Sequence, residues 1–379
     1  MFAYAVVVCL TLFVGWLYVW ERLIETASLA DPLKHTLLGF FVVAYALQAA
    51  RWLFFRVKGD LSWLVGPAYF SVGILSHLFL ATLLKDICYQ LWWLVAPQSF
   101  QVHEAWVNSW VSYVIFFICL AANLWGAQTA YEGPEIQKVK LDGRKGRQRE
   151  ASRPLRLVQI SDLHVGPLIR RPYVENVVDL CQSLNPDVVV FTGDIGDGKP
   201  EHLENDLLPF KRLKVPQGIY YVTGNHEYYW NVDGWIHVAK GVGMRVLFNE
   251  GIEVVHEGQS VWIAGVPDRS AKAIRPDHIE DIDAAIKEAP ESSYKILLAH
   301  QPRSVIKAEK AGFDLVLSGH THAGQYFPFT HVVGWFNPYS KDLHKHGNAH
   351  IYVNRGTGFW GPPLRLGATS EITLLEIDL

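Results

Sequence analysis

The stretch "PDVVVFTGD", residues 186–194, decides the fold class of the C-terminal part of this 379-residue chain. Its short apolar run ends in a Gly-Asp turn and is typical of a buried strand. The stretch "GIYYVTGNHE", residues 218–227, repeats this plan, and residues 171–184 have helical spacing. Strands that alternate with helices indicate an α/β domain.

The same alternation extends over residues 155–379, which we expect to form one domain. Helical patterns near residues 277–288 and 302–311 separate some of the further strands. These expected strands are residues 155–161, 259–266, 294–300, 314–320, 349–356 and 371–378.

The N-terminal third has long apolar runs and few charges. A helix needs about 20 apolar residues to cross the hydrocarbon core of a bilayer. One run contains Arg51, which must lie near an interface. A cleavable signal peptide is disfavoured because no basic residue precedes the first run. A buried helical bundle in a soluble protein is disfavoured because Trp and Tyr lie near the ends of the runs. We therefore predict a transmembrane region of about four helices over residues 1–131, with spans at residues 2–20, 36–55, 61–84 and 105–131.

Basic residues predict the orientation of these spans. They are enriched near residues 56–60 and in the segment 132–154, but not in the loops near 21–34 and 86–104. The positive-inside rule then places both termini and the large domain in the cytoplasm. We interpret residues 132–154 as a basic linker, either solvated or in contact with anionic lipid head groups.

Charge and cysteine content exclude some classes of protein. The formal net charge of −3 carries no nucleic-acid signature. No cysteine spacing resembles a metal pair or a disulfide framework. We interpret the cysteines as free thiols, compatible with a reducing compartment: Cys9, Cys88, Cys119 and Cys181.

Polar clusters follow five of the expected strands. Ligands bind beyond the carboxyl ends of strands in open α/β sheets, so clusters far apart in the sequence can converge there. Glycines beside them permit tight turns. The clusters are Asp162 with His164, Asp194 with Asp197, Asn225 with His226, His300, and His320 with His322.

The types of side chain in these clusters indicate a metal centre. Asp and Asn supply oxygen and His supplies nitrogen, with no thiolate, which suits Mn, Fe or Zn rather than Mg alone. Two such cations about 3.5–4 Å apart can stabilise the attacking and leaving oxygens of phosphoryl hydrolysis. Each motif alone could be an ordinary turn or an exposed histidine, but five at successive strand ends make coincidence a poor explanation.

The ordered motifs resemble the calcineurin-like metallophosphoesterases. The matching segments are "DLH" at 162–164, "GDIGD" at 193–197, "GNHE" at 224–227, "AH" at 299–300 and "GHTH" at 319–322. The segments "HAGQ" and "NRGTGFWGPPLRLG" further resemble the bacterial membrane-anchored phosphodiesterase branch of that family. The resemblance implies a four-layer α/β/β/α sandwich that holds two divalent metal ions.

Residue roles follow from the same resemblance. A metal-bound hydroxide would attack phosphorus in line. His226 would protonate the leaving oxygen or stabilise the phosphoryl charge, and Asp197 would orient His226. The alternative for His226 is a helix-start histidine without a chemical role. The implied ligands are Asp162, His164 and His322 for one metal, Asn225, His300 and His320 for the other, and Asp194 as the bridge.

One departure from the family bears on the substrate. Phosphoprotein phosphatases continue the second motif with an arginine that grips phosphate, whereas Gly198 and Lys199 follow Asp197 here. Arg355 and Arg365 either contact a phosphate or form surface salt bridges. We expect Glu227 to support a turn, and the histidines of one polar loop to line the rim of the site: His344, His346 and His350.

We therefore expect a membrane-anchored hydrolase of phosphodiester or pyrophosphate bonds, with a lipid-linked or nucleotide-linked substrate. One alternative is a phosphomonoesterase, including a protein phosphatase. The other is a non-catalytic membrane scaffold with a metal-binding domain.

Overall fold

The computed structural model describes the chain except residues 1, 28, 54–61, 96–103 and 144–152. The chain divides into two compact units. The first comprises Met1–Gln128 with Gly361–Leu364, and the second Thr129–Trp360 with Arg365–Leu379.

The first unit is helical, and four of its helices are long and apolar enough to cross a membrane. This agrees with the expected number of spans. The third helix continues to Val95, past the end of the expected span. The helices are α1 (Phe2–Val19), which continues as a π-helix (Trp20–Glu25), α2 (Asp31–Leu53), α3 (Ser62–Val95) and α4 (Glu104–Glu132).

Polar contacts between helices add to the apolar packing of this unit. The Trp16 indole donates a hydrogen bond to the Gln48 side chain at 3.0 Å, and Gln48 donates to Ser71 Oγ at 2.9 Å. All three residues are buried, so α1, α2 and α3 are joined by a hydrogen-bonded chain inside the bundle. Buried polar groups of a membrane bundle need such partners, since lipid offers none.

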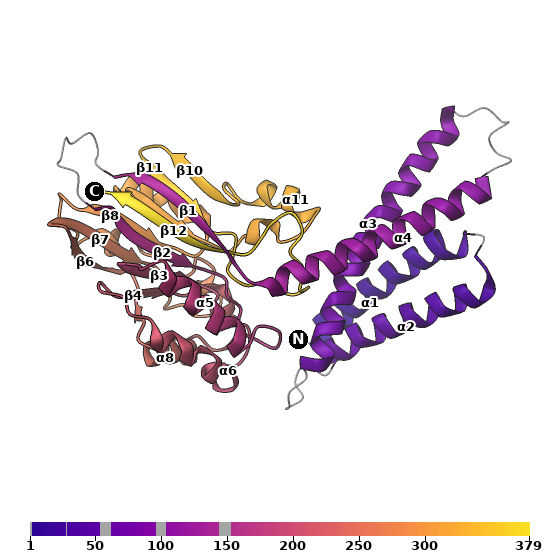
Figure 1. Ribbon diagram of the computed structural model, residues 1–379, viewed down its shortest axis with the longest axis horizontal. Coiled ribbons are helices and arrows are strands. Elements are labelled where there is room, and N and C mark those ends of the chain that lie inside the picture. Colours follow the sequence, from indigo (N-terminus) through magenta and orange to yellow (C-terminus); the bar gives the residue numbers. More distant parts are fainter. Residues whose placement is uncertain (1, 28, 54–61, 96–103, 144–152) are drawn as a thin grey trace. The chain divides into compact units, whose positions relative to one another are not determined.

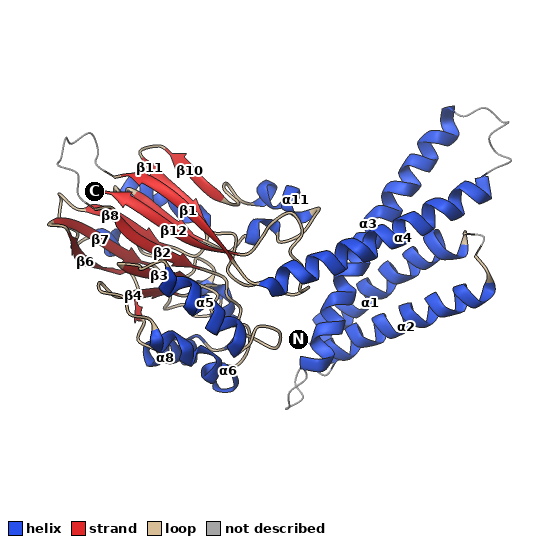
Figure 2. Cartoon of the chain, in the orientation of Figure 1, coloured by secondary structure: helices blue, strands red, loops and turns tan. Residues whose placement is uncertain are grey.

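The second unit contains two six-stranded sheets (Figures 1 and 2). The first sheet has the order β1 (Glu135–Asp142), β12 (Glu371–Asp378), β2 (Leu155–Ile160), β3 (Val188–Thr192), β4 (Ile219–Val222), β5 (Arg245–Val246). The second has the order β10 (Asp342–His346), β11 (Ala349–Val353), β9 (Leu315–Ser318), β8 (Tyr294–Leu298), β7 (Gln259–Gly265), β6 (Glu250–His256).

Helices cover the outer faces of the sheets, which confirms the predicted four-layer sandwich. Several of them are short, with five to eight residues. The helices of this unit are α5 (Arg171–Ser183), α6 (Pro200–Leu207), α7 (Asn225–Trp230), α8 (Val232–Gly241), α9 (Ile282–Ile286), α10 (Val305–Ala311) and α11 (Phe329–Phe336). Short 3₁₀ turns lie at Leu208–Arg212, Ala271–Ala273, Pro302–Ser304 and His322–Gly324.

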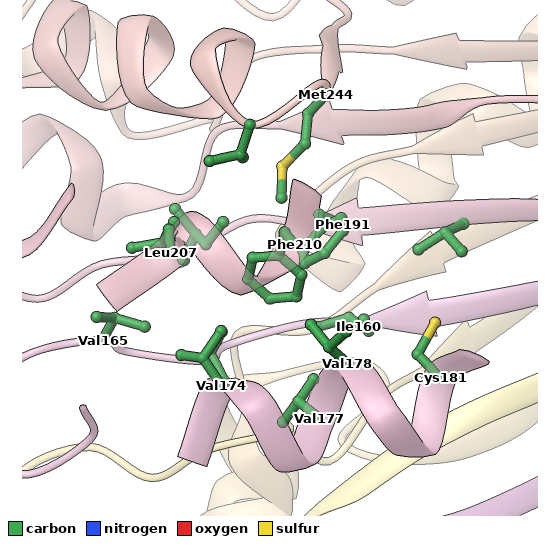
Figure 3. Close-up of a cluster of buried hydrophobic side chains, with 14 of the residues drawn as sticks. Ile160, Val165, Val174, Val177, Val178, Cys181, Phe191, Leu207, Phe210 and Met244 are labelled. Atoms are coloured by element: carbon green, nitrogen blue, oxygen red, sulfur yellow. The ribbon is translucent and has the colours of Figure 1, made fainter. Parts of the chain in front are cut away.

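Three apolar layers hold the sandwich together. One lies between the sheets, and the others lie beneath the outer helices. Figure 3 shows the layer under the first sheet, where Val174 and Val178 of α5 pack near Phe191 of β3 and Phe210. The two phenylalanine rings meet edge to face with centroids 5.0 Å apart, an arrangement that aromatic pairs prefer.

We expected the whole of segment 132–154 to be a linker, but part of it is a strand. Residues 135–142 form β1, which pairs in parallel with β12 along its whole length. β1 lies at the edge of the first sheet, where lysine is favoured because charge protects an exposed edge from pairing with other chains. Because β1 contains Lys138 and Lys140, its composition is that of a basic linker, which is why the sequence did not indicate a strand.

Candidate metal centre

All the motif residues closely follow strands: most of them lie in turns, and Asn225 and His226 lie at the start of α7. Those of the first sheet follow β2, β3 and β4, and those of the second follow β8 and β9. Five of them have positive φ, a left-handed conformation that costs a non-glycine residue roughly 1–3 kcal/mol and is characteristic of functional sites. These residues are Asp162 (51°), His164 (52°), Asp194 (52°), His320 (70°) and His322 (49°).

The first group comprises Asp162, His164 and His322, whose candidate ligand atoms all lie within 4.8 Å of one another. The Nε2 atoms of His164 and His322 are 3.0 Å apart, and His322 Nε2 is 3.6 Å from Asp162 Oδ1. All three residues are buried. Asp162 is fixed by hydrogen bonds from the Ser161 hydroxyl at 2.5 Å and the backbone N–H of His320 at 3.0 Å.

The second group comprises Asp194, His300 and His320, joined by Asn225. His300 Nε2 lies 3.1 Å from Asn225 Oδ1 and 3.2 Å from His320 Nδ1. The other nitrogen of His300, Nδ1, lies 2.7 Å from the carbonyl oxygen of Thr192. Because a carbonyl only accepts, Nδ1 carries a proton, and Nε2 is the nitrogen that faces the other candidate ligands and would bind a metal once deprotonated.

Asp194 lies between the two groups. Its Oδ2 atom is 3.8 Å from His164 Nε2 in the first group and 3.3 Å from His300 Nε2 in the second. Burial would raise the pKa of Asp194, but the charges of His300 and His226 outweigh it and hold that pKa well below its ordinary value. An ionised carboxylate in this position can bind two cations at once.

The chemical state of the donors fits divalent metal ions. Burial lowers the pKa of His164 to about 3 and that of His320 to about 4, and it holds the pKa of His322 well below its ordinary value. These imidazoles are therefore neutral, the form in which histidine binds a metal. Neutral imidazoles together with a buried carboxylate suit Mn, Fe or Zn.

His226 and Asp197 lie beside the first group. His226 Nδ1 is 3.0 Å from Asp197 Oδ1, and His226 Nε2 is 4.0 Å from Asp194 Oδ2. The Trp230 indole donates a second hydrogen bond to Asp197 Oδ1 at 2.8 Å. Burial opposes protonation of His226, but the Asp194 charge and the hydrogen bond with Asp197 raise its pKa to about 9. His226 can therefore hold a proton at neutral pH.

Comparison with known proteins identifies the family. The model of the calcineurin-like phosphoesterase family matches residues 155–324. A zebrafish (Danio rerio) "transmembrane protein with metallophosphoesterase domain" is 32% identical over 378 residues, which cover 96% of this chain and 86% of that protein. The chain belongs to the calcineurin-like metallophosphoesterases. It is a metal-dependent phosphoester hydrolase.

Bacterial relatives share this family. An "uncharacterized metallophosphoesterase" of Helicobacter pylori (strain J99) is 37% identical over 269 residues, which cover 69% of each chain. Among solved structures, a putative 5'-nucleotidase from Staphylococcus aureus has a TM-score of 0.39 at 12% identity. The match covers 59% of this chain and about half of that structure, 54% of its length.

Glu227 organises the turns of this metallophosphoesterase, although it is not one of the candidate ligands. Its side chain is fully buried and accepts hydrogen bonds from the backbone N–H groups of Gly224 (2.6 Å), Asp194 (3.1 Å), Ile195 (2.8 Å) and Gly196 (3.3 Å). One carboxylate thus ties the turn after β3 to the turn after β4. The sequence predicted that Glu227 supports a turn, but not that it binds backbone N–H groups of two turns.

Two glycines let the backbone approach the carboxylates. A Cβ atom at Gly224 would collide with Asp194 Oδ1, and one at Gly319 would collide with Asp162 Oδ2. Neither clash can be relieved by a distant flexible side chain, because both involve short, buried acids. This close approach explains why the third and fifth motifs, "GNHE" and "GHTH", begin with glycine.

The two arginines of the C-terminal segment have structural contacts. Arg355 pairs with Asp342, and its Nε is 3.4 Å from Glu371 Oε2. Arg365 is 1% exposed, so it forms no surface salt bridge. Its guanidinium donates to the carbonyl oxygens of four residues in the turns behind the first group, namely His322, Arg355, Gly356 and Gly358.

The histidines expected at the rim lie elsewhere. His344 and His346 belong to β10, and His350 belongs to β11. β11 runs parallel to β9, with His350 opposite Leu315 at the start of β9. His346 and His350 are therefore at the end of the sheet opposite His320. The sequence could not show this, because it did not indicate the β10–β11 hairpin.

The "HAGQ" segment positions an aromatic side chain beside His226. Gln325 Nε2 donates to the carbonyl oxygen of Trp360 at 2.9 Å, and the Trp360 N–H donates to Gln325 Oε1 at 2.8 Å. The Trp360 ring lies edge to face with His226, with centroids 5.5 Å apart, and Tyr229 lies 5.2 Å from His226 on its own helix. Both aromatic residues are exposed, so they flank His226 where substrate can reach it.

Proposed function

We propose that this protein is a membrane-anchored, dinuclear phosphodiesterase or pyrophosphatase. Asp162, His164 and His322 would hold one metal, Asn225, His300 and His320 the other, and Asp194 would bridge them. When bound, the two cations would supply a nucleophilic hydroxide and offset negative charge on the phosphoryl oxygens.

The observation that carries the diester assignment is that Arg355 and Arg365 already have partners within the protein. A phosphomonoester carries about −1.5 to −2 charges at neutral pH, and an arginine fork matches the geometry of such a dianion. Arg355 is occupied by Asp342 and Glu371, and Arg365 is buried against carbonyl oxygens. Neither guanidinium is available to grip a dianion, which favours a singly charged diester.

Leaving-group chemistry gives His226 a role that a diester, a pyrophosphate and a monoester would all require. A diester or pyrophosphate releases an oxygen that must gain a proton unless it is very acidic. His226, held at 3.0 Å by Asp197 and protonated at neutral pH, would donate that proton. Asp197 would keep the ring oriented with Nε2 toward the metal centre, 4.0 Å from Asp194.

The test compares two substrates on the full-length protein purified in detergent and loaded with Mn²⁺. We expect faster turnover of bis-p-nitrophenyl phosphate than of p-nitrophenyl phosphate, and loss of both activities in Asp194→Ala. Faster turnover of the monoester would support a phosphomonoesterase instead. Retention of activity in Asp194→Ala would contradict the dinuclear assignment. A metal-loaded protein that hydrolyses neither compound would support the scaffold hypothesis.

We further infer that the catalytic unit is cytoplasmic, since basic residues are concentrated near residues 56–60 and 132–154. C-terminal fusions test the orientation. Green fluorescent protein should be fluorescent and alkaline phosphatase inactive at that position, and the reverse pattern would place the domain on the other side.

A further inference from the structure

The last candidate span joins the catalytic unit almost directly. α4 ends at Glu132 and β1 begins at Glu135, so the connection can extend over at most about 11 Å. The end of α4 from Thr129 already belongs to the catalytic unit, and Ala130 is fully buried in its core. Whichever end of the domain contains Glu135 is therefore held close to the bilayer.

Strand pairing shows which end this is. Glu135 of β1 is opposite Glu371, the first residue of β12. β12 runs antiparallel to β2, with Thr373 opposite Gln159, one residue before β2 ends. The turn after β2 carries Asp162. The chain thus enters the domain at the same end as the metal centre.

An exposed apolar helix lies at that end. α11 begins five residues after the end of the His322–Gly324 turn, and a Cβ atom at Gly324 would collide with the backbone of Phe329. In the part of the chain that the structure describes, no residue of α11 is buried. Trp335 is 80% and Phe336 67% exposed.

The composition of this segment suits a bilayer interface. Residues 327–336, "FPFTHVVGWF", contain no acidic residue, and Lys341 follows shortly after. Phe327 and Phe329 are also exposed. Large apolar side chains exposed together in water mark an interaction site. Tryptophan and phenylalanine beside basic residues are typical of helices that lie in the head-group region.

We propose that residues 327–336 form a membrane-docking surface that rests on the bilayer reached by α4. The occupant is lipid rather than a second copy of the chain, because the short connection already brings the bilayer to this end of the domain. Trp360, 51% exposed and 5.5 Å from His226, is hydrogen-bonded to Gln325, four residues before α11, and so links this segment to the metal centre. The opening of the site therefore faces lipid. This surface does not depend on which phosphoester is cleaved.

A fluorescent probe on α11 tests the docking surface. Cys9→Ser and Cys88→Ser remove the more accessible thiols, since Cys119 and Cys181 are buried. Trp335→Cys, or Phe336→Cys as a second site, then carries a nitrobenzoxadiazole label. The labelled full chain is reconstituted into phosphatidylcholine and phosphatidylglycerol vesicles, with and without a doxyl-labelled lipid that quenches nearby fluorophores.

Val255→Cys provides the matched control. Val255 is also apolar and 60% exposed. It lies on β6 next to His256, which pairs with Gln259 at the start of β7, and so at the end of the sheet away from the metal centre. Metal content equal to that of the unlabelled protein shows that each variant is folded.

We expect the doxyl lipid to quench the label at position 335 or 336 severalfold more than the label at 255. Absence of quenching at both α11 positions would overturn the proposal. If their emission were also shifted to the blue, a protein surface, not lipid, would cover α11. Equal quenching at 255 would likewise overturn it, because contact with lipid would then not be specific to this end.

Discussion

His226 and Asp197 form a pair beside the metal centre, with Nδ1 3.0 Å from Oδ1, although Asp197 follows β3 and His226 lies in α7, after β4. Asp197 also accepts from Trp230, so its carboxylate is fixed from two sides. The pair thus presents one defined nitrogen, His226 Nε2, to the reacting phosphoester.

Replacement of His226 should affect substrates according to their leaving groups. In His226→Gln we expect hydrolysis of a diester with an alkyl leaving group to fall by about 10²–10⁴-fold, the usual contribution of a general acid. Loss on bis-p-nitrophenyl phosphate should be much smaller, because p-nitrophenolate leaves without a proton. Steady-state rates on the two substrates measure this, and equal losses would show that His226 acts on the phosphoryl charge instead.

Removal of the bridging carboxylate should reduce metal binding. We expect Asp194→Asn to lower metal affinity by at least about 10–100-fold, the loss typical even of supporting residues around a metal. Metal content by mass spectrometry after dialysis measures this without reference to activity. Asp187→Asn is the control. Asp187 is also buried, but it lies just before the start of β3, away from the metal centre, and pairs with Arg153. A variant at 194 with unchanged metal content would contradict the bridge.

Glu227 should contribute to stability through the turns that it joins. Glu227→Ala leaves four backbone N–H groups without their acceptor. Each buried unpaired group costs about 1–3 kcal/mol, so for the four groups together we expect a fall of at least about 4 kcal/mol in the free energy of unfolding. Glu227→Gln keeps an acceptor oxygen and should lose less. Thermal unfolding of both variants in detergent tests the order, and equal losses would contradict it.

The strands of the catalytic unit were largely predictable, because strands buried on both faces have nearly continuous apolar runs. β3 and β4 are fully buried and coincide with the stretches that indicated the fold. The strands that were missed, β1, β5, β6 and β10, are the edge strands of the two sheets, and β1 and β10 also carry lysine or histidine. The pairing of β1 comes from a distant partner, β12, which a local pattern does not contain.

The candidate ligands were predictable for a related reason. The carboxyl ends of parallel strands meet, so residues there converge whatever their separation in the sequence. The surroundings of the ligands were not predictable. Arg365 is buried only because four carbonyl oxygens from two separate turns surround its guanidinium, and the sequence places none of them.

Gln325 should influence substrate binding through Trp360. Gln325→Ala removes both hydrogen bonds that fix the Trp360 backbone. Because Trp360 flanks His226 without replacing it, we expect KM for the diester to rise severalfold while kcat changes by less than about twofold. Trp360→Ala should show the same pattern. A fall in kcat alone would mean that the contact with His226 serves the chemical step.

Glu371 should make stability depend on pH. Burial raises the pKa of this carboxyl, which accepts hydrogen bonds from Tyr352 and Thr373. The folded state then binds a proton more tightly than the unfolded state, where glutamic acid has a pKa of about 4.3. This contribution to stability is complete below that value and is lost as pH rises through the folded pKa.

Comparison with Glu371→Gln isolates this contribution, because glutamine cannot ionise. The melting temperature of the native protein relative to the variant should fall as pH rises above about 4.3. A difference that stays constant with pH would mean that the pair with Arg355 cancels the effect of burial.

The short join between α4 and β1 has a kinetic consequence. A domain attached through Gly133 and Pro134 cannot leave the plane of the membrane to search the surrounding solution. Its encounters with any substrate in the same leaflet are governed by lateral diffusion in two dimensions. The turnover rate should then follow the mole fraction of substrate in the surface, and dilution with inert phospholipid should slow it even when the total substrate concentration is unchanged.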